Sequence, residues 1–135
     1  KRQLLALACP TQAGQALFQQ HCSSCHGGDA EGIPGLAPPL RHAQLWQGLG
    51  EDAGRYITGV MAGGMSGQLS AQGQLYIGLV MPPQSHLPSA ELAAVADYLL
   101  QLNGLQQSVS PADVESARNQ PPSHAALRAL RPKNL

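Results

Sequence analysis

The chain has 135 residues, enough for one domain with a modest core, and its 8 Lys and Arg balance its 8 Asp and Glu. This neutral balance offers no basic surface of the kind that nucleic-acid binding requires. The 15 Gly and 11 Pro predict long loops between a few helices, and no run of eighteen apolar residues predicts a membrane span within this chain.

Residues 1–10 are interpreted as an N-terminal segment that ends near a cysteine, Cys9. The short apolar run before Cys9 follows Lys1 and Arg2, and together they resemble a bacterial lipobox behind the end of a signal peptide. The apolar run is short for such a signal. A free thiol, or a disulfide to another chain, is therefore the favoured alternative to a lipid anchor at Cys9.

Residues 11–25 are predicted to form a helix. Gly14, Phe18, Cys22 and Cys25 recur at helical spacing and therefore share one stripe of it. This stripe places Phe18 on the side of the two thiols, and Gly14 leaves room for another helix to cross closely.

The helix leads into Cys22-Ser23-Ser24-Cys25-His26, which has the C-x-x-C-H spacing of a c-type haem attachment site. Two thiols three residues apart can add to the two vinyl groups on one porphyrin edge, and His26 can then bring an imidazole nitrogen to the iron. Half a zinc site is an alternative, but no second C-x-x-C or H-x₃₋₅-H follows. A thioredoxin-like pair lacks its βαβ surroundings. The third alternative, a chance pair of structural cysteines, leaves the spacing unexplained, so the motif predicts one covalently attached haem c.

Residues 27–40 are rich in Gly and Pro and are predicted to form a loop, in which Pro38 or Pro39 can offer a carbonyl to the His26 ring. A plain surface loop is the alternative. Residues 43–62 predict two short helices interrupted by glycines. Trp46 lies in the first, where its indole N–H can point to a haem propionate or its ring can simply pack in the core.

Residues 63–80 predict a small β-hairpin with a turn at residues 71–74, and it leads to Met81-Pro82-Pro83. The two prolines favour extended, stiff backbone, which suits projecting one thioether at an iron. Residues 89–103 predict the strongest helix, capped by Ser89. Residues 105–135 predict a polar extension of short helices that packs back on the domain.

Several side chains are candidates for the second axial ligand of the iron on chemistry alone: Met61, Met65, Met81, His42, His86 and His124. Met61 lies in an apolar run and is expected in the core. Met65 lies among glycines and is the main rival. Met81 is favoured because Pro82 and Pro83 stiffen the segment that carries it, Met81-Pro82-Pro83, which we call the Met81 strap.

The chain resembles the class I (mitochondrial-type) cytochrome c family over about Gly14 to Gly104. The similarity rests on the Gly14-to-His26 helix, on Pro38, on the Met81 strap and on the last helix of this range. It implies an all-α cytochrome c fold, with helices around one covalently bound haem and a small β-hairpin before the strap. Residues 11–104 would form the domain and residues 105–135 a C-terminal extension.

The resemblance implies a full set of site residues. Cys22 and Cys25 would hold the haem covalently, and His26 and Met81 would be the axial ligands of its iron. The remaining residues expected around the haem are Phe18, Pro38, Trp46 and Tyr76.

Two protein ligands on the iron leave no place for a substrate, so the predicted function is single-electron transfer. The resemblance implies that its redox partners are periplasmic members of a bacterial respiratory chain. The protein would be a shuttle, or the haem subunit or domain of a larger oxidoreductase complex, and not an enzyme by itself. The expected partners are a periplasmic dehydrogenase, a reductase or a terminal oxidase, with membrane association only through a complex or a lipid anchor. The alternative is a haem-based gas sensor with a labile methionine ligand.

Overall fold

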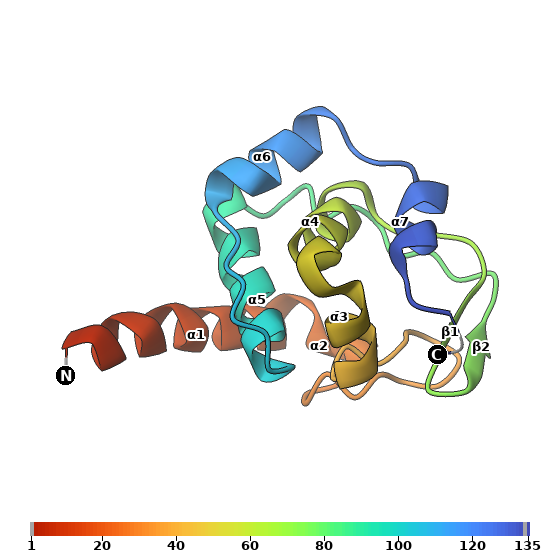
Figure 1. The fold of residues 1–135 in the computed structure, drawn as a ribbon, viewed down its shortest axis with the longest axis horizontal. Helices are drawn as coiled ribbons and strands as arrows, with labels where there is room; N and C mark the ends of the chain where they lie inside the picture. Colours follow the sequence, from red (N-terminus) through yellow and green to blue (C-terminus); the bar gives the residue numbers. More distant parts are fainter. Residues whose placement is uncertain (1, 134) are drawn as a thin grey trace.

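The computed structural model describes the backbone of residues 2–133 and 135, and the side chains of residues 12–133 and 135. The prediction for Cys9 lies outside the described side chains. The fold is helical with one small hairpin, as predicted (Figure 1). The elements in chain order are α1 (Arg2–His21), α2 (Ser23–His26), α3 (Ala43–Leu49), the 3₁₀ helix η1 (Gly50–Asp52), α4 (Ala53–Gly63), β1 (Leu69–Ala71), β2 (Gln74–Tyr76), α5 (Ser89–Leu102), α6 (Pro111–Asn119) and α7 (His124–Leu130).

The first helix differs from the prediction at both ends. It begins at Arg2 rather than at residue 11 and continues through Pro10. It ends at His21, and Cys22 separates it from α2 with φ −120° and ψ −26°. Hydrogen bonds continue across this break, from Cys22 N to Phe18 O at 2.8 Å and from His26 N to Cys22 O at 3.0 Å. The motif therefore stands on a break between two helices instead of on one helical stripe.

Helix α1 crosses α5 at Gly14, as the sequence predicted. A Cβ at Gly14 would overlap the carbonyl oxygen of Ala94 and would lie 2.8 Å from the Cβ of Tyr98. One turn further on, the fully buried Phe18 packs against Tyr98 with ring centroids 5.7 Å apart. Phe18 thus belongs to the contact between the two helices.

The hairpin forms where the sequence predicted it. Strands β1 and β2 pair antiparallel, with Leu69 opposite Tyr76 and Ala71 opposite Gln74. Gln72 and Gly73 make the turn, and both have positive φ, 51° and 78°, as a two-residue turn of this hand requires.

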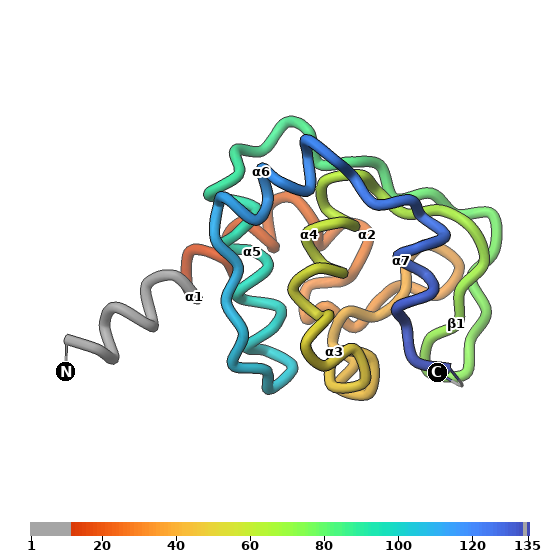
Figure 2. Tube along the Cα trace, turned by 45° about the horizontal axis from the view of Figure 1, so that its top comes forward, coloured from red at the N-terminus to blue at the C-terminus, as the bar shows by residue number. Residues whose placement is uncertain are grey.

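The C-terminal extension folds back over the domain, which confirms the prediction. In Figure 1 it runs from α5 across α4 towards the hairpin, and Figure 2 shows the same path from another side. Ser110 and Asp113 form a reciprocal capping box at the start of α6. Val114 of α6 and Leu127 of α7 are buried against the core. The extension is therefore an integral layer of the fold.

The start of α5 corrects one prediction. Pro88 occupies the N-cap position, and Ser89 makes no capping hydrogen bond. Its hydroxyl group instead contacts Glu115 and Arg118 of α6. Within the described residues, no helix has the length and apolarity that crossing a membrane would take.

Candidate haem site

A cavity of about 480 Å³ lies between the two helices of the motif, the loop before α3, helices α3 to α5 and the hairpin. The structure brings most of the predicted site residues into its lining: Cys22, Cys25, His26, Pro38, Trp46, Tyr76 and Met81. Phe18 is not among the lining residues, and its ring packs against Tyr98 of α5. The helix break at Cys22 lies between Phe18 in α1 and the rest of the motif in α2.

The two cysteines of the motif are both unpaired thiols. Cys25 is exposed and Cys22 is half-buried. Burial, and then the neighbouring Cys25, raise the pKa of the Cys22 thiol to about 11. Two reduced thiols on the wall of one apolar cavity are what thioether formation with a porphyrin edge needs.

His26 is buried, and its ring is held by the loop that follows it. Its Nδ1–H donates to the carbonyl oxygen of Pro38 at 3.1 Å, so the predicted contact is present. Burial lowers the pKa of His26, and the Pro38 hydrogen bond acts in the opposite direction. A neutral imidazole that donates through Nδ1 leaves the lone pair of Nε2 available for a metal.

Gly32 allows the loop of residues 27–40 to turn back towards His26. Its φ is +81°, and a Cβ there would lie 2.5 Å from the nitrogen of Pro39. Gly32 N also donates to the carbonyl of His26 at 2.7 Å. A residue with a side chain could not pass so close to the two prolines, so Gly32 allows Pro38 to reach the imidazole.

Met65 and Met81 form an isolated antiparallel bridge. Met81 N donates to Met65 O at 2.8 Å, and Met65 N donates to Met81 O at 3.0 Å. Opposed residues of such a pair place their side chains on the same side, and both methionines line the cavity. Met61 is in the core, as predicted, and it also contributes to the lining. The fold thus brings Met65 and Met81 side by side at the cavity, and this pairing alone does not select one of them as the ligand.

The histidine candidates separate clearly. His124 Nε2 donates to the carbonyl of Gly63 at 2.8 Å and its Nδ1 accepts from Ser66 Oγ at 2.7 Å, so both ring nitrogens already have hydrogen-bond partners, and His124 does not line the cavity. His42 does not line the cavity either. His86 is exposed at the cavity, 5.6 Å from the ring of His21 between centroids, a neighbour that the sequence did not reveal.

For Trp46, the structure favours packing in the core over a hydrogen bond from the indole N–H to a haem propionate. It is almost fully buried, and its indole N–H donates to the carbonyl of Leu40 at 2.8 Å, so this donor is already in use. Its ring still lines the cavity and meets Tyr56 edge-on.

The cation at the cavity comes from the C-terminal extension. Arg131 lines the cavity, and its Nη1 donates to the hydroxyl of Tyr56 at 2.8 Å. Both ring nitrogens of His42 are buried without a partner among the described residues. Burial, and then the charge of Arg131, lower the pKa of His42. Nothing in the sequence around position 131 signals this role, because the contact joins the last helix to α4.

These residues fit haem c. The cavity is lined mostly by apolar side chains, as a porphyrin requires, and the same lining holds the two thiols, the His26 imidazole with its free Nε2, and the thioethers of Met61, Met65 and Met81. Arg131 supplies a guanidinium for a carboxylate at the edge.

Comparison with known proteins agrees with this geometry. The Cytochrome c family profile matches residues 11–103. Two cytochrome c-552 sequences of Thermus thermophilus are 36% identical over 96 residues and 35% identical over 89 residues; the matches cover 70% and 65% of this chain, and 62% and 66% of those proteins. A Cbb3-type cytochrome c oxidase subunit CcoP of Rhodobacter capsulatus is 31% identical over 102 residues, which is 70% of this chain and 30% of that protein. This chain thus matches less than two thirds of the length of each of these relatives.

The family match covers the motif, the loop to Pro38, the methionine bridge and the crossing of α1 and α5 in one continuous range. On this evidence the chain belongs to the cytochrome c family, whose cofactor is covalently bound haem c.

Proposed function

We propose that this chain is a monohaem c-type cytochrome domain that transfers single electrons. Cys22 and Cys25 would hold the haem through thioether bonds, and His26 and Met81 would occupy the two axial positions of its iron. The observation that carries the proposal is the His26 imidazole, oriented by Pro38, in the same cavity lining as the motif thiols and the methionine bridge. Haem iron cycles between its ferrous and ferric states, and protein ligands on both sides leave no position for a substrate. The protein's part is therefore electron transfer rather than catalysis.

The choice of Met81 over Met65 rests on the backbone of the two segments. Pro82 and Pro83 restrict φ directly after Met81, which limits the positions of its thioether. Met65 follows Gly63 and Gly64, the most permissive residues for a backbone. A stiff segment can hold a ligand at fixed distance from an iron with a smaller loss of entropy on binding.

The site also has a surface suited to a protein partner. Leu36 and Val80 line the cavity and are nevertheless exposed, Val80 by 69%. Leu75 and Ile77 of the hairpin region are exposed as well. Residues 56–90 contain no Asp, Glu, Lys or Arg. We propose that redox partners meet this uncharged face, where electrostatic steering is weak.

The relatives support two versions of this function. One is named a cytochrome and the other a subunit of a cytochrome c oxidase. We propose an electron carrier between redox proteins as the first version, and the haem domain of a larger oxidoreductase complex as the second. Both versions place the haem domain outside the bacterial cytoplasm, in the periplasm, where thioether attachment takes place in the family. None of the relatives above carries a name that refers to gas sensing.

Attachment of the haem tests the proposal directly. Acid acetone should leave the haem with the polypeptide, because thioether bonds resist extraction. Replacing both Cys22 and Cys25 by Ala should release it, whereas Cys9→Ala, a matched removal of a thiol outside the motif, should not. Extraction of haem from the unmodified protein into the organic phase would contradict the proposed function.

A further inference from the structure

The C-terminal extension supplies charged donors to a part of the chain that has none. Residues 56–90 carry no charged side chain of their own. Arg128 donates to the carbonyl of Ser66, and Arg131 Nη2 donates to the carbonyl of Ser70 at 2.7 Å. These contacts hold the segment that runs from the Met65 bridge into β1.

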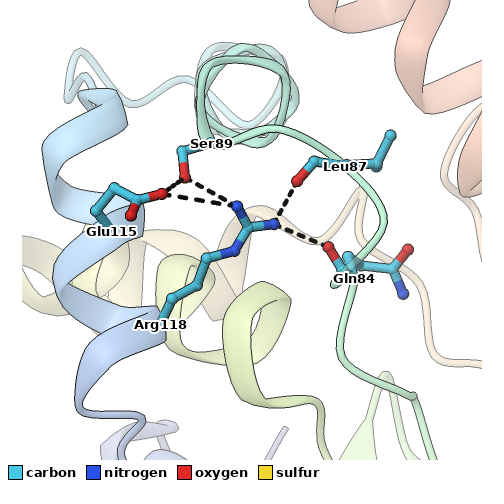
Figure 3. Close-up of polar contacts among 5 residues, drawn as sticks. All are labelled: Gln84, Leu87, Ser89, Glu115 and Arg118. Atoms are coloured by element: carbon cyan, nitrogen blue, oxygen red, sulfur yellow. Dashed lines mark hydrogen bonds and ion pairs between the residues drawn. The ribbon is translucent and has the colours of Figure 1, made fainter.

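Arg118 makes the corresponding contacts after Met81 (Figure 3). Its Nη2 donates to the carbonyl oxygen of Gln84 at 3.0 Å and also to that of Leu87. Its Nη1 donates to Ser89 Oγ at 2.9 Å and lies 3.8 Å from the Glu115 carboxylate. One guanidinium thus joins α6 to both ends of the short turn that leads into α5.

The side chain of Arg118 is largely buried, and two of its hydrogen bonds are to backbone carbonyls. Only 23% of it is exposed, so water competes weakly for these carbonyls. The Leu87 carbonyl accepts from it directly before Pro88, which has no N–H of its own to give to this turn. Glu115 lies beside the other terminal nitrogen, Nη1, which donates to Ser89, and its carboxylate favours the orientation of the guanidinium that faces the turn.

The segment between Met81 and Gln84 connects the contacts of Arg118 to the backbone of Met81. The Met81 backbone is fixed on one side by its two hydrogen bonds to Met65. Only Pro82 and Pro83 separate it from Gln84, and both have a restricted φ. Gln84 N donates to the carbonyl of Met61 at 2.9 Å, which anchors the same point to α4. A displacement of Gln84 would therefore move Met81, because the linker cannot absorb it.

We propose that Arg118 is a positioning residue for the axial methionine: through the Gln84 and Leu87 carbonyls it fixes the Met81 segment and keeps the thioether from leaving the iron. The inference rests on the proposed function, in which Met81 is the axial ligand. In this arrangement the C-terminal extension takes part in the haem site and sets how readily an outside ligand replaces Met81.

Cyanide binding to the ferric holoprotein tests this proposal. At saturating cyanide the rate equals the rate at which the thioether leaves the iron. Arg118→Gln removes the forked cation, and this limiting rate should rise about tenfold, the effect of losing one charge-assisted hydrogen bond from the bound state. Arg118→Lys keeps the charge but not the fork, and its rate should lie between the two.

Two control variants separate positioning from stability. Ser89→Ala removes the hydroxyl that contacts Glu115 and Arg118 of α6 but leaves both carbonyl contacts of Arg118, so it should lower the melting temperature without changing the cyanide rate. Arg55→Gln removes an exposed arginine that pairs with Asp52 far from the strap, and it should change neither quantity.

An Arg118→Gln holoprotein that folds, keeps its near-infrared sulfur-to-iron band and binds cyanide at the rate of the unmodified protein would overturn the inference alone. If that variant yields no folded protein, the Arg118→Lys rate decides, and a rate equal to that of the unmodified protein refutes the proposal. A haem that acid acetone extracts from the unmodified protein overturns the proposed function, and this inference with it.

Discussion

The crossing of α1 and α5 gives the most quantitative prediction. Gly14→Ala would normally stabilise a helix by about 0.5–1 kcal/mol, because alanine loses less backbone entropy on folding than glycine. Here the added Cβ meets the carbonyl oxygen of Ala94 and lies 2.9 Å from its carbonyl carbon. These atoms belong to the α5 backbone, so the helices must separate. Overpacking of this kind costs about 1–3 kcal/mol, and we expect a net loss of about 1–2 kcal/mol for Gly14→Ala and more for Gly14→Val.

Thermal unfolding of the holoprotein measures this loss, at about 4 °C of melting temperature per kcal/mol for a chain of this length. Gly54→Ala in α4 is the matched control, since its Cβ would lie 3.5 Å from Gln107 Oε1 and 3.8 Å from Val109 Cγ2, which is ordinary contact. The control should be as stable as the unmodified protein or more stable. A Gly14→Ala variant that also gains stability would show that the two helices can separate freely and that the argument from close approach is wrong.

Three further predictions follow from the site and its surroundings. Met81→Ala should lower the reduction potential, admit outside ligands and abolish the near-infrared sulfur-to-iron band of the ferric protein. Met65→Ala should retain this band, and the reverse result would identify Met65 as the ligand. Asp97 accepts from Val109 N, and burial raises its pKa above the ordinary 3.8, so the native state loses stability as the pH rises through this range. Asp97→Asn cannot titrate, and its stability relative to the unmodified protein should increase from pH 4 to pH 7; a constant difference would contradict the assignment. Electron transfer to the physiological partner should change only a few-fold between low and high salt, and a fall of two decades would show that charge guides the encounter.

Local chemistry explains why much of the fold was predictable. The Ser110–Asp113 capping box and the Gln72-Gly73 turn are formed by residues within four positions of one another. Their hydrogen bonds and φ angles need no distant partner, so the residue types suffice. The same holds for the C-x-x-C-H spacing, whose chemistry depends on neighbouring residues.

Predictions about where a side chain points were less secure. Phe18 shares the helical stripe of the thiols in the sequence, yet the break at Cys22 separates the two, and Phe18 packs against Tyr98 instead. Ser89 has the residue type of a helix cap, but its hydroxyl contacts α6. In both cases the partner that the side chain contacts lies in another helix.

The sequence by itself determined the covalent chemistry of the site, the order of the helices and the close approach at Gly14. Only the tertiary structure joined Met65 to Met81, occupied both nitrogens of His124 and brought Arg118 and Arg131 from the extension to the strap and the cavity. The physical reason is the range of the interactions. Backbone conformation follows from neighbouring residues, whereas the partner of a buried polar group is whichever distant segment the packing of the core brings within hydrogen-bond distance.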